Sequence, residues 1–233
     1  MSLTKKSIFI VLLILLLDQV LKIWVKTHMT LFEQIPILGD RVVLHFVENN
    51  GMAFGLRLPG DYGKLILTLF RLVAAVIIGF YMRYLIRRNA HPGLILSLSM
   101  IMAGALGNII DSAFYGMIFS GSSSATVATI FPEGGGYSSF LHGKVVDMFY
   151  FPVLRGSYPS WFPFRPGEPF IFFRPVFNIA DTSITIAVVL ILFNQKRYFH
   201  SLNTVLENES TPEEVTVTGT YSDDENKQTD FSA

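Results

Sequence analysis

Four long apolar runs constrain what this chain of 233 residues can fold into. They span residues 7–25, 65–85, 94–118 and 177–193. A helix needs about 20 mostly apolar residues to cross a bilayer core, and every backbone polar group in hydrocarbon must be satisfied within the protein. The runs therefore predict an all-α membrane protein with four transmembrane helices.

The first run has an alternative interpretation as a cleavable secretory signal, because Lys5 and Lys6 precede it. Such a signal ends in a cleavage site made of small residues. Here Asp18 and Lys22 occupy that place, and apolar residues continue to Val25. We therefore expect the first helix to be retained.

The charges flanking the runs predict the orientation in the membrane. Residues 1–7, 82–93 and 195–203 contain Lys and Arg but no Asp or Glu. The connecting segments 26–64 and 119–176 hold eight basic and seven acidic residues. The positive-inside rule then places both termini in the cytoplasm and both long loops outside it. The expected location is the bacterial inner membrane, with several spans.

The segments outside the membrane are expected to be ordered, and the C-terminal tail is not. Residues 35–47 consist of two apolar stretches broken by Gly39-Asp40, which predicts a β-hairpin with a two-residue turn. A long extracytoplasmic loop should connect helices 3 and 4. Residues 1–203 form the predicted membrane domain. Residues 204–233 hold eight acidic residues and one Lys, which predicts a disordered cytoplasmic tail.

Four aspartates are expected to lie near one face of the membrane. With the predicted orientation and a rise of about 1.5 Å per residue, Asp18, Asp111 and Asp181 all fall in the outer half of their helices. Asp147 lies in the second outer loop, within an apolar stretch, and is free to join them. Ionisable residues inside membranes are costly and therefore point to function.

Each of these aspartates also has a structural interpretation. Asp18 and Lys22 are four residues apart and can form an ion pair within one helix. Asn108 and Asp111 can hydrogen-bond between helices, beside the small residues Gly104 and Gly107. Asn178 and Asp181 have the spacing of a helix cap. Arg71, inside the second run, is near enough to one end to extend towards the headgroups.

Little chemistry besides that of carboxylates is available to this chain. It has no cysteine, and its five histidines show no HExxH spacing. It also lacks a GxSxG motif, a P-loop and a dinucleotide-binding fingerprint. Two aspartates held close together share a proton, so one can act as a general base on water while the other polarises a carbonyl. Such a pair hydrolyses a peptide bond, and we expect no cofactor or metal.

Five short motifs make the sequence similar to a known family. They are, in chain order, Asp18-Gln19-Val20-Leu21-Lys22, Asn49-Asn50-Gly51-Met52-Ala53-Phe54-Gly55, Gly104-Ala105-Leu106-Gly107-Asn108-Ile109-Ile110-Asp111, Val145-Val146-Asp147-Met148 and Phe177-Asn178-Ile179-Ala180-Asp181. Together they resemble the lipoprotein signal peptidases (signal peptidase II), membrane aspartyl proteases of bacteria. The resemblance covers roughly residues 5–195.

This resemblance implies roles for residues and a substrate. Asp147 and Asp181 would be the catalytic pair. Eight residues would shape or support the substrate-binding site: Asp18, Lys22, Asn49, Gly51, Asn108, Asp111, Asn178 and Ala180. The implied substrates are prolipoproteins whose cysteine carries diacylglycerol, cleaved just before that cysteine. The implied partners are thus these substrates and membrane lipid, with no nucleic acid, and the chain is expected to be a monomer.

Two departures from the family pattern leave questions open. Ser112 follows Asp111 where the family usually has Arg, so a cation is missing or is supplied by Lys144, Arg155 or Arg174. Asp147 also lies unusually far from both Asp111 and Asp181, which leaves Asp111 as an alternative partner for Asp181. The inserted segments, about 119–142 and 152–174, are candidates for a lid or a partner surface.

Two other functional classes compete with a peptidase. A proton-coupled transporter would use intramembrane carboxylates as a relay. The clustering of polar residues near one face, instead of along a path across the membrane, argues against it. A noncatalytic scaffold would use the aspartates only to join helices.

Overall fold

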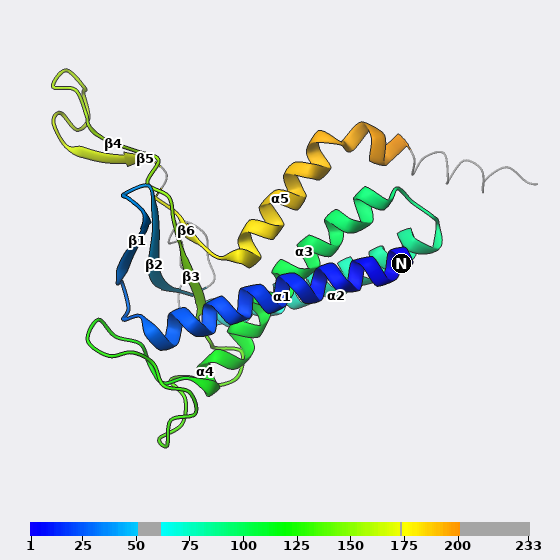
Figure 1. Cartoon of the computed structure of the whole chain (residues 1–233), viewed down its shortest axis with the longest axis horizontal. Helices are drawn as coiled ribbons and strands as arrows, with labels where there is room; N and C mark the ends of the chain where they lie inside the picture. The colour runs from blue at the N-terminus through cyan, green and yellow to red at the C-terminus, as the bar shows by residue number, and fades with distance from the viewer. Residues whose placement is uncertain (51–61, 173, 201–233) are drawn as a thin grey trace, which may run out of the picture.

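The computed structural model describes residues 1–50, 62–172 and 174–200 (Figure 1). Its helices are α1 (Leu3–His28), α2 (Tyr62–Arg87), α3 (Pro92–Ile110), the π-helical turn η2 (Asp111–Tyr115), α4 (Gly116–Ile118) and α5 (Ile179–Phe193). Its strands are β1 (Gln34–Leu38), β2 (Val42–Asn49), β3 (Val145–Tyr150), β4 (Leu154–Ser157), β5 (Pro169–Phe172) and β6 (Val176–Phe177). The helices extend to one side of the molecule and the strands gather at the other.

The predicted apolar runs form helices, and the chain is a membrane protein with several of them. Within the described ranges, three helical segments are long and apolar enough to cross a bilayer: Leu3–His28, Gly63–Arg87 and Pro92–Ile118. The fourth run forms α5, which has only 15 residues. After a turn at Asn194 the chain is helical again over residues 195–200. Many large apolar side chains of α1 and α2 are exposed, as lipid-facing positions require; Phe80, for example, is 72% exposed.

Helix α3 is the central helix of the bundle. It packs against α1, α2 and α5, whereas α2 makes few direct contacts with either α1 or α5. Two glycines permit this close packing. A Cβ at Gly104 would lie 2.3 Å from the carbonyl oxygen of Ala180, and one at Gly107 would lie 2.8 Å from Oδ2 of Asp18. Small residues at such positions let helix backbones approach closely within a membrane.

A four-stranded antiparallel sheet lies at one end of the bundle, which we call the sheet end. Its order is β1-β2-β3-β6, so it combines strands from both long loops. The predicted hairpin is present, but its turn contains three residues, Gly39, Asp40 and Arg41, and not two. Gly39 has a positive φ of 53°, a conformation that glycine adopts without strain. The predicted hairpin is therefore part of a larger sheet, which also includes β3 and β6 from the second long loop.

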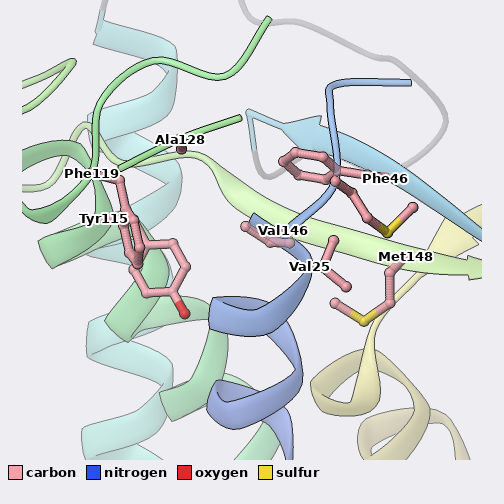
Figure 2. Close-up of a cluster of buried hydrophobic side chains, with 8 residues drawn as sticks. Val25, Phe46, Tyr115, Phe119, Ala128, Val146 and Met148 are labelled. Carbon is pink, nitrogen blue, oxygen red and sulfur yellow. The ribbon is translucent and has the colours of Figure 1, made fainter. Parts of the chain in front are cut away.

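A buried apolar cluster fixes the sheet to the end of α1 (Figure 2). Val25 from α1 lies near Phe46 of β2 and near Val146 and Met148 of β3. These four side chains are essentially inaccessible to solvent. Because the cluster joins α1, β2 and β3, it sets the height at which Asp147 lies relative to the helices.

The two inserted segments differ in structure. Segment 119–142 folds back on the end of the α3–η2–α4 helix, where the amides of Leu141 and Gly143 donate to the carbonyls of Ala113 and Ser112. Segment 152–174 contains the β4–β5 hairpin, which projects away from the helices (Figure 1). Gly51, the four motif residues that follow it (52–55) and the predicted C-terminal tail lie outside the described residues.

Candidate active site

Asp147 lies on β3, between the two strands that carry its partners. In β2 the backbone of Asn49 pairs with Val145, and the Nδ2 of Asn49 donates to Oδ2 of Asp147 at 3.0 Å. Strand β6 pairs with the far end of β3 and leads directly into Asn178, whose Nδ2 donates to Oδ1 of Asp147 at 2.8 Å. The sheet register therefore gives each oxygen of this carboxylate one amide donor.

Asp181 is the third residue of α5, in the first turn after the cap. Asn178 caps this helix, because its Oδ1 accepts from the backbone N–H of Asp181 at 2.8 Å. The carboxylate of Asp181 accepts from Nδ2 of Asn108 on α3 at 2.8 Å. A negative charge is favoured at this position by the helix dipole. One side chain, Asn178, thus contacts both Asp147 and the backbone of Asp181.

The contacts fix how the two central amides are oriented. The Oδ1 of Asn178 faces a backbone N–H, which can only donate, so its Nδ2 must face Asp147. The Oδ1 of Asn108 accepts from the ammonium of Lys22 at 3.1 Å, so its Nδ2 must face Asp181. Both amides therefore present donors to the two aspartates.

Lys22 joins the two remaining aspartates. Its Nζ lies 2.8 Å from Oδ2 of Asp18 and 2.8 Å from Oδ2 of Asp111, and all three side chains are at most 1% exposed. Gln19 donates to Oδ1 of Asp111 at 2.9 Å, and the backbone N–H of Val146 donates to its Oδ2 at 3.3 Å. Asp111 is thus held in an ion pair with Lys22. Asp147 instead accepts a hydrogen bond from Asn178, which also binds the backbone N–H of Asp181.

Asp18 serves as more than the partner of Lys22. Its Oδ1 accepts from the backbone N–H of Ala180 at 2.9 Å, so it satisfies one of the free donors at the start of α5. The ion pair within α1 is present as its structural interpretation suggested, and it extends to α3 and α5. Asp18 and Lys22 therefore connect three helices around the two amide-bound aspartates.

A second buried ionic cluster lies beside Asn49. Glu48 contacts the ammonium groups of Lys26 and Lys144, and its Oε1 accepts from Ser122 at 2.8 Å. These contacts hold the pKa of Glu48 below its ordinary value in spite of burial, which alone would raise it. Lys144 thus pairs with Glu48 and not with Asp111. Arg155 and Arg174, the other proposed replacements for the family arginine, are exposed.

Asp147 has the electrostatics expected of a group that holds a proton near neutrality. It is 2% exposed. Burial raises its pKa to about 7, and the neighbouring charge of Asp181 acts in the same direction. The hydrogen bond from Asn49 opposes this shift only in part. At neutral pH a substantial fraction of Asp147 is therefore protonated.

Three residues outside the predicted set of site residues also contribute to the site. Gln19 stands inside a quoted motif, and Gly143 stands just before β3. Gly143 is required because a Cβ there would lie only 2.1 Å from the carbonyl oxygen of Asp111. Arg71, expected to extend towards the headgroups, is partly buried, and the charges of Asp181, Asp147 and Asp111 act on its guanidinium. The influence of these charges on Arg71 depends on how α2 packs on α3, which local sequence does not specify.

The site contains the groups needed for acid–base chemistry on water. Across the parts of the chain that the structure describes, no three His, Cys, Asp or Glu side chains gather as a metal site would require. What the arrangement offers is a pair of carboxylates, one of them protonated in part at neutral pH, held by three amides. This pair lies at the boundary between the bundle and the sheet.

Comparisons with known proteins show which family the chain belongs to. The family model described as signal peptidase (SPase) II matches residues 10–196. The chain belongs to the signal peptidase II family. It is 52% identical to a lipoprotein signal peptidase of Porphyromonas gingivalis over 184 residues, covering 78% of this chain and 79% of that protein.

A second relative supports membership of the signal peptidase II family, and a solved structure shares the fold. A lipoprotein signal peptidase of Amoebophilus asiaticus is 37% identical over 190 residues, covering 80% of this chain and 76% of that protein. A bacterial membrane enzyme solved by the in meso method at 2.3 Å resolution shares the fold. Its TM-score is 0.53 at 24% identity, covering 89% of this chain and 92% of that one.

Proposed function

We propose that this protein is an aspartic endopeptidase that removes signal peptides from diacylglyceryl-modified prolipoproteins. Cleavage would fall just before the lipidated cysteine. The observation that carries the proposal is that Asn178 connects the two aspartates. Its side-chain amide donates to the carboxylate of Asp147, and its Oδ1 caps the helix turn that holds Asp181. Family membership supports a peptidase acting on prolipoproteins, and the geometry supports the aspartic mechanism.

The two carboxyl groups divide the chemistry between them. Asp147 is buried and its raised pKa favours the protonated form, so it donates a hydrogen bond to the oxygen of the scissile carbonyl. Asp181 is more accessible and, as the carboxylate, takes a proton from the attacking water. Water adds to the carbonyl carbon to give a tetrahedral intermediate. Asp181 passes this proton to the leaving amine as the C–N bond breaks, which restores the carboxylate of Asp181 and leaves Asp147 protonated.

The surrounding contacts keep this pair in position. Because both oxygens of Asp147 accept amide hydrogen bonds, the carboxyl cannot rotate freely. Arg71 of α2 interacts electrostatically with Asp181 and Asp147, so we expect its positive charge to help to stabilise negative charge that develops on the substrate. No step requires the ion pair of Lys22 to open, so Lys22 acts through Asn108 as a positioning residue.

The packing offers a lipidated substrate a route to the site. Helices α2 and α5 both pack on α3 but make few contacts with each other, so we expect a substrate to reach Asp181 between them. A substrate with its acyl chains in the bilayer can enter there without leaving the membrane. The charge pattern of the flanks places both termini in the cytoplasm, which puts the aspartates near the periplasmic face.

The test is cleavage by the purified full-length protein in detergent micelles. The substrate is a synthetic precursor peptide with a diacylglyceryl cysteine, and the matched control is the same peptide with an unmodified cysteine. We expect a single cut before the lipidated cysteine, located by mass spectrometry, and at least about 100-fold slower cleavage of the control. Absence of any cleavage would refute the peptidase proposal. Substrate-dependent proton flux in proteoliposomes would then favour a transporter.

A further inference from the structure

A groove lies among α1, α2 and α3 at the end of the bundle opposite the sheet. Its volume is about 440 Å³, within the range of roughly 300–1,000 Å³ common for ligand sites. It exists because α1 and α2 each pack on α3 but hardly touch each other. One wall is α1 with Ile8, Val11 and Leu12, and Met102 of α3 contributes to the lining. Its inner surface is mainly apolar and lies at membrane depth.

The groove ends in two cations on one helix face. Arg83 and Arg87 of α2 both line it, and they are four residues apart, so their side chains lie on the same side of the helix. Both are exposed, and within the described part of the chain neither forms an ion pair. The groove therefore combines an apolar channel with a doubly positive mouth.

A buried hydroxyl without a partner lies in the same lining. Ser7 of α1 is 4% exposed, and its Oγ has no hydrogen-bond partner among the described residues. Leaving a buried donor unsatisfied is unfavourable, more so where no water is present. Ser7 also lines the groove together with Thr4. A ligand with acceptor oxygens near the two arginines would satisfy this hydroxyl.

We propose that this groove binds an anionic phospholipid of the leaflet on that side of the membrane. An acyl chain would lie along the apolar lining, and the phosphate would sit at Arg83 and Arg87. The ester oxygens would then come near Ser7. This site is far from Asp147 and Asp181, which lie at the sheet end, so it does not depend on the proposed peptidase activity.

The apolar lining favours lipid over the other acidic occupant that the sequence offers. Residues 204–233 are acidic enough to meet two arginines, but they are also polar, with few side chains suited to an apolar channel. A phospholipid brings both an apolar chain and a negative head. A phospholipid is therefore the expected ligand of the groove, and the experiment below tests residues 204–233 as the alternative.

The experiment measures phosphatidylglycerol binding to the full-length protein by native mass spectrometry from detergent. The test variant is R83Q/R87Q, and the matched control is K5Q/R88Q, which removes two charges at the same end from residues outside the lining. Two basic residues near an anionic lipid predict an affinity loss of about 30-fold for R83Q/R87Q and under about 3-fold for the control. Phosphatidylcholine should bind at least about 10-fold more weakly than phosphatidylglycerol.

A second variant tests the apolar channel without changing charge. A Cβ at Gly79 would meet only Cε of Met102, at the ordinary contact distance of 3.4 Å, so Gly79→Leu can be accommodated and fills the groove. It should also weaken phosphatidylglycerol binding. Equal losses in both charge variants, equal binding of the two lipids or no effect of Gly79→Leu would overturn the proposal. Displacement of the lipid by a synthetic peptide of residues 204–233 would assign the groove to that segment and also overturn it.

Discussion

Replacing Lys22 with Met should be among the most damaging single changes to this protein. The substitution keeps the length and apolar stem of the side chain and removes its charge. It leaves Asp18 and Asp111, both at most 1% exposed, without their shared cation and close to each other. Breaking a buried ion pair from one side costs about 3–5 kcal/mol, and here two carboxylates lose their partner at once. We expect Lys22→Met to lower the free energy of unfolding by about 3–5 kcal/mol or more.

The assay is equilibrium unfolding in mixed micelles with increasing SDS, followed by tryptophan fluorescence. Arg165→Met is the matched control, because Arg165 pairs with Glu168 at 3.7 Å and both side chains are exposed. That pair should contribute less than about 1 kcal/mol. The double variant K22M/D111N removes one orphaned charge and should regain part of the loss. A cost below about 1 kcal/mol for Lys22→Met, or no recovery in the double variant, would refute the argument.

Three other predictions concern pH, packing and charge near the site. The kcat/KM should fall about tenfold per pH unit above about pH 7, because the raised pKa of Asp147 means that it loses its proton there. Gly143→Ala should destabilise the protein by about 1–3 kcal/mol in the same unfolding assay, because the new Cβ would lie 2.1 Å from the carbonyl of Asp111. Arg71→Met should lower kcat about 10- to 100-fold, with partial rescue by Arg71→Lys, because a positive charge that interacts with Asp181 and Asp147 would be lost.

Each of these predictions has a control and a contrary result. A pH profile that stays flat to pH 9 would contradict the proton assigned to Asp147. Gly134→Ala is the packing control, because a Cβ there meets nothing within 4 Å, and an equal effect at both glycines would count against the close approach. Arg155→Met, on the exposed strand β4, should leave kcat unchanged. A loss there as large as for Arg71→Met would point to a general effect of charge.

The stability of the protein should also depend on pH, but over a lower range than kcat/KM. An acid whose pKa is higher in the folded state binds more protons there than in the unfolded state. The stabilising contribution of protonated Asp147 is therefore present at acidic pH and is lost as pH rises from about 4 to about 7.

The helices and the β1–β2 hairpin could be predicted because local sequence specifies them. Long apolar runs have few alternatives to helix in hydrocarbon, and Gly39 marks a turn between apolar stretches. Strand β3 was harder to predict. Its residues Val145 to Met148 are all buried, so the sequence shows no alternation of apolar and polar positions. Its partners β2 and β6 come from distant parts of the chain.

The members of the site could be named from motifs, but their contacts could not. Topology placed Asp18, Asp111 and Asp181 at one depth, and the structure brings them together with Asp147. Depth alone does not say which carboxylate faces a lysine and which faces an amide. That division depends on the rotation of α1 and α3 about their axes and on the register of β3. The role of Arg71 depends in the same way on how α2 packs.

The most direct test of the central proposal compares single-turnover cleavage of a lipidated precursor by Asp147→Asn and Asp181→Asn. Asp40→Asn, in the exposed turn between β1 and β2, is the matched control. If the two aspartates are the catalytic pair, each active-site variant should lose at least about 10³-fold in rate while remaining folded in the membrane, and Asp40→Asn should match the unmodified protein. A rate above about a tenth of normal in either active-site variant would contradict the assignment.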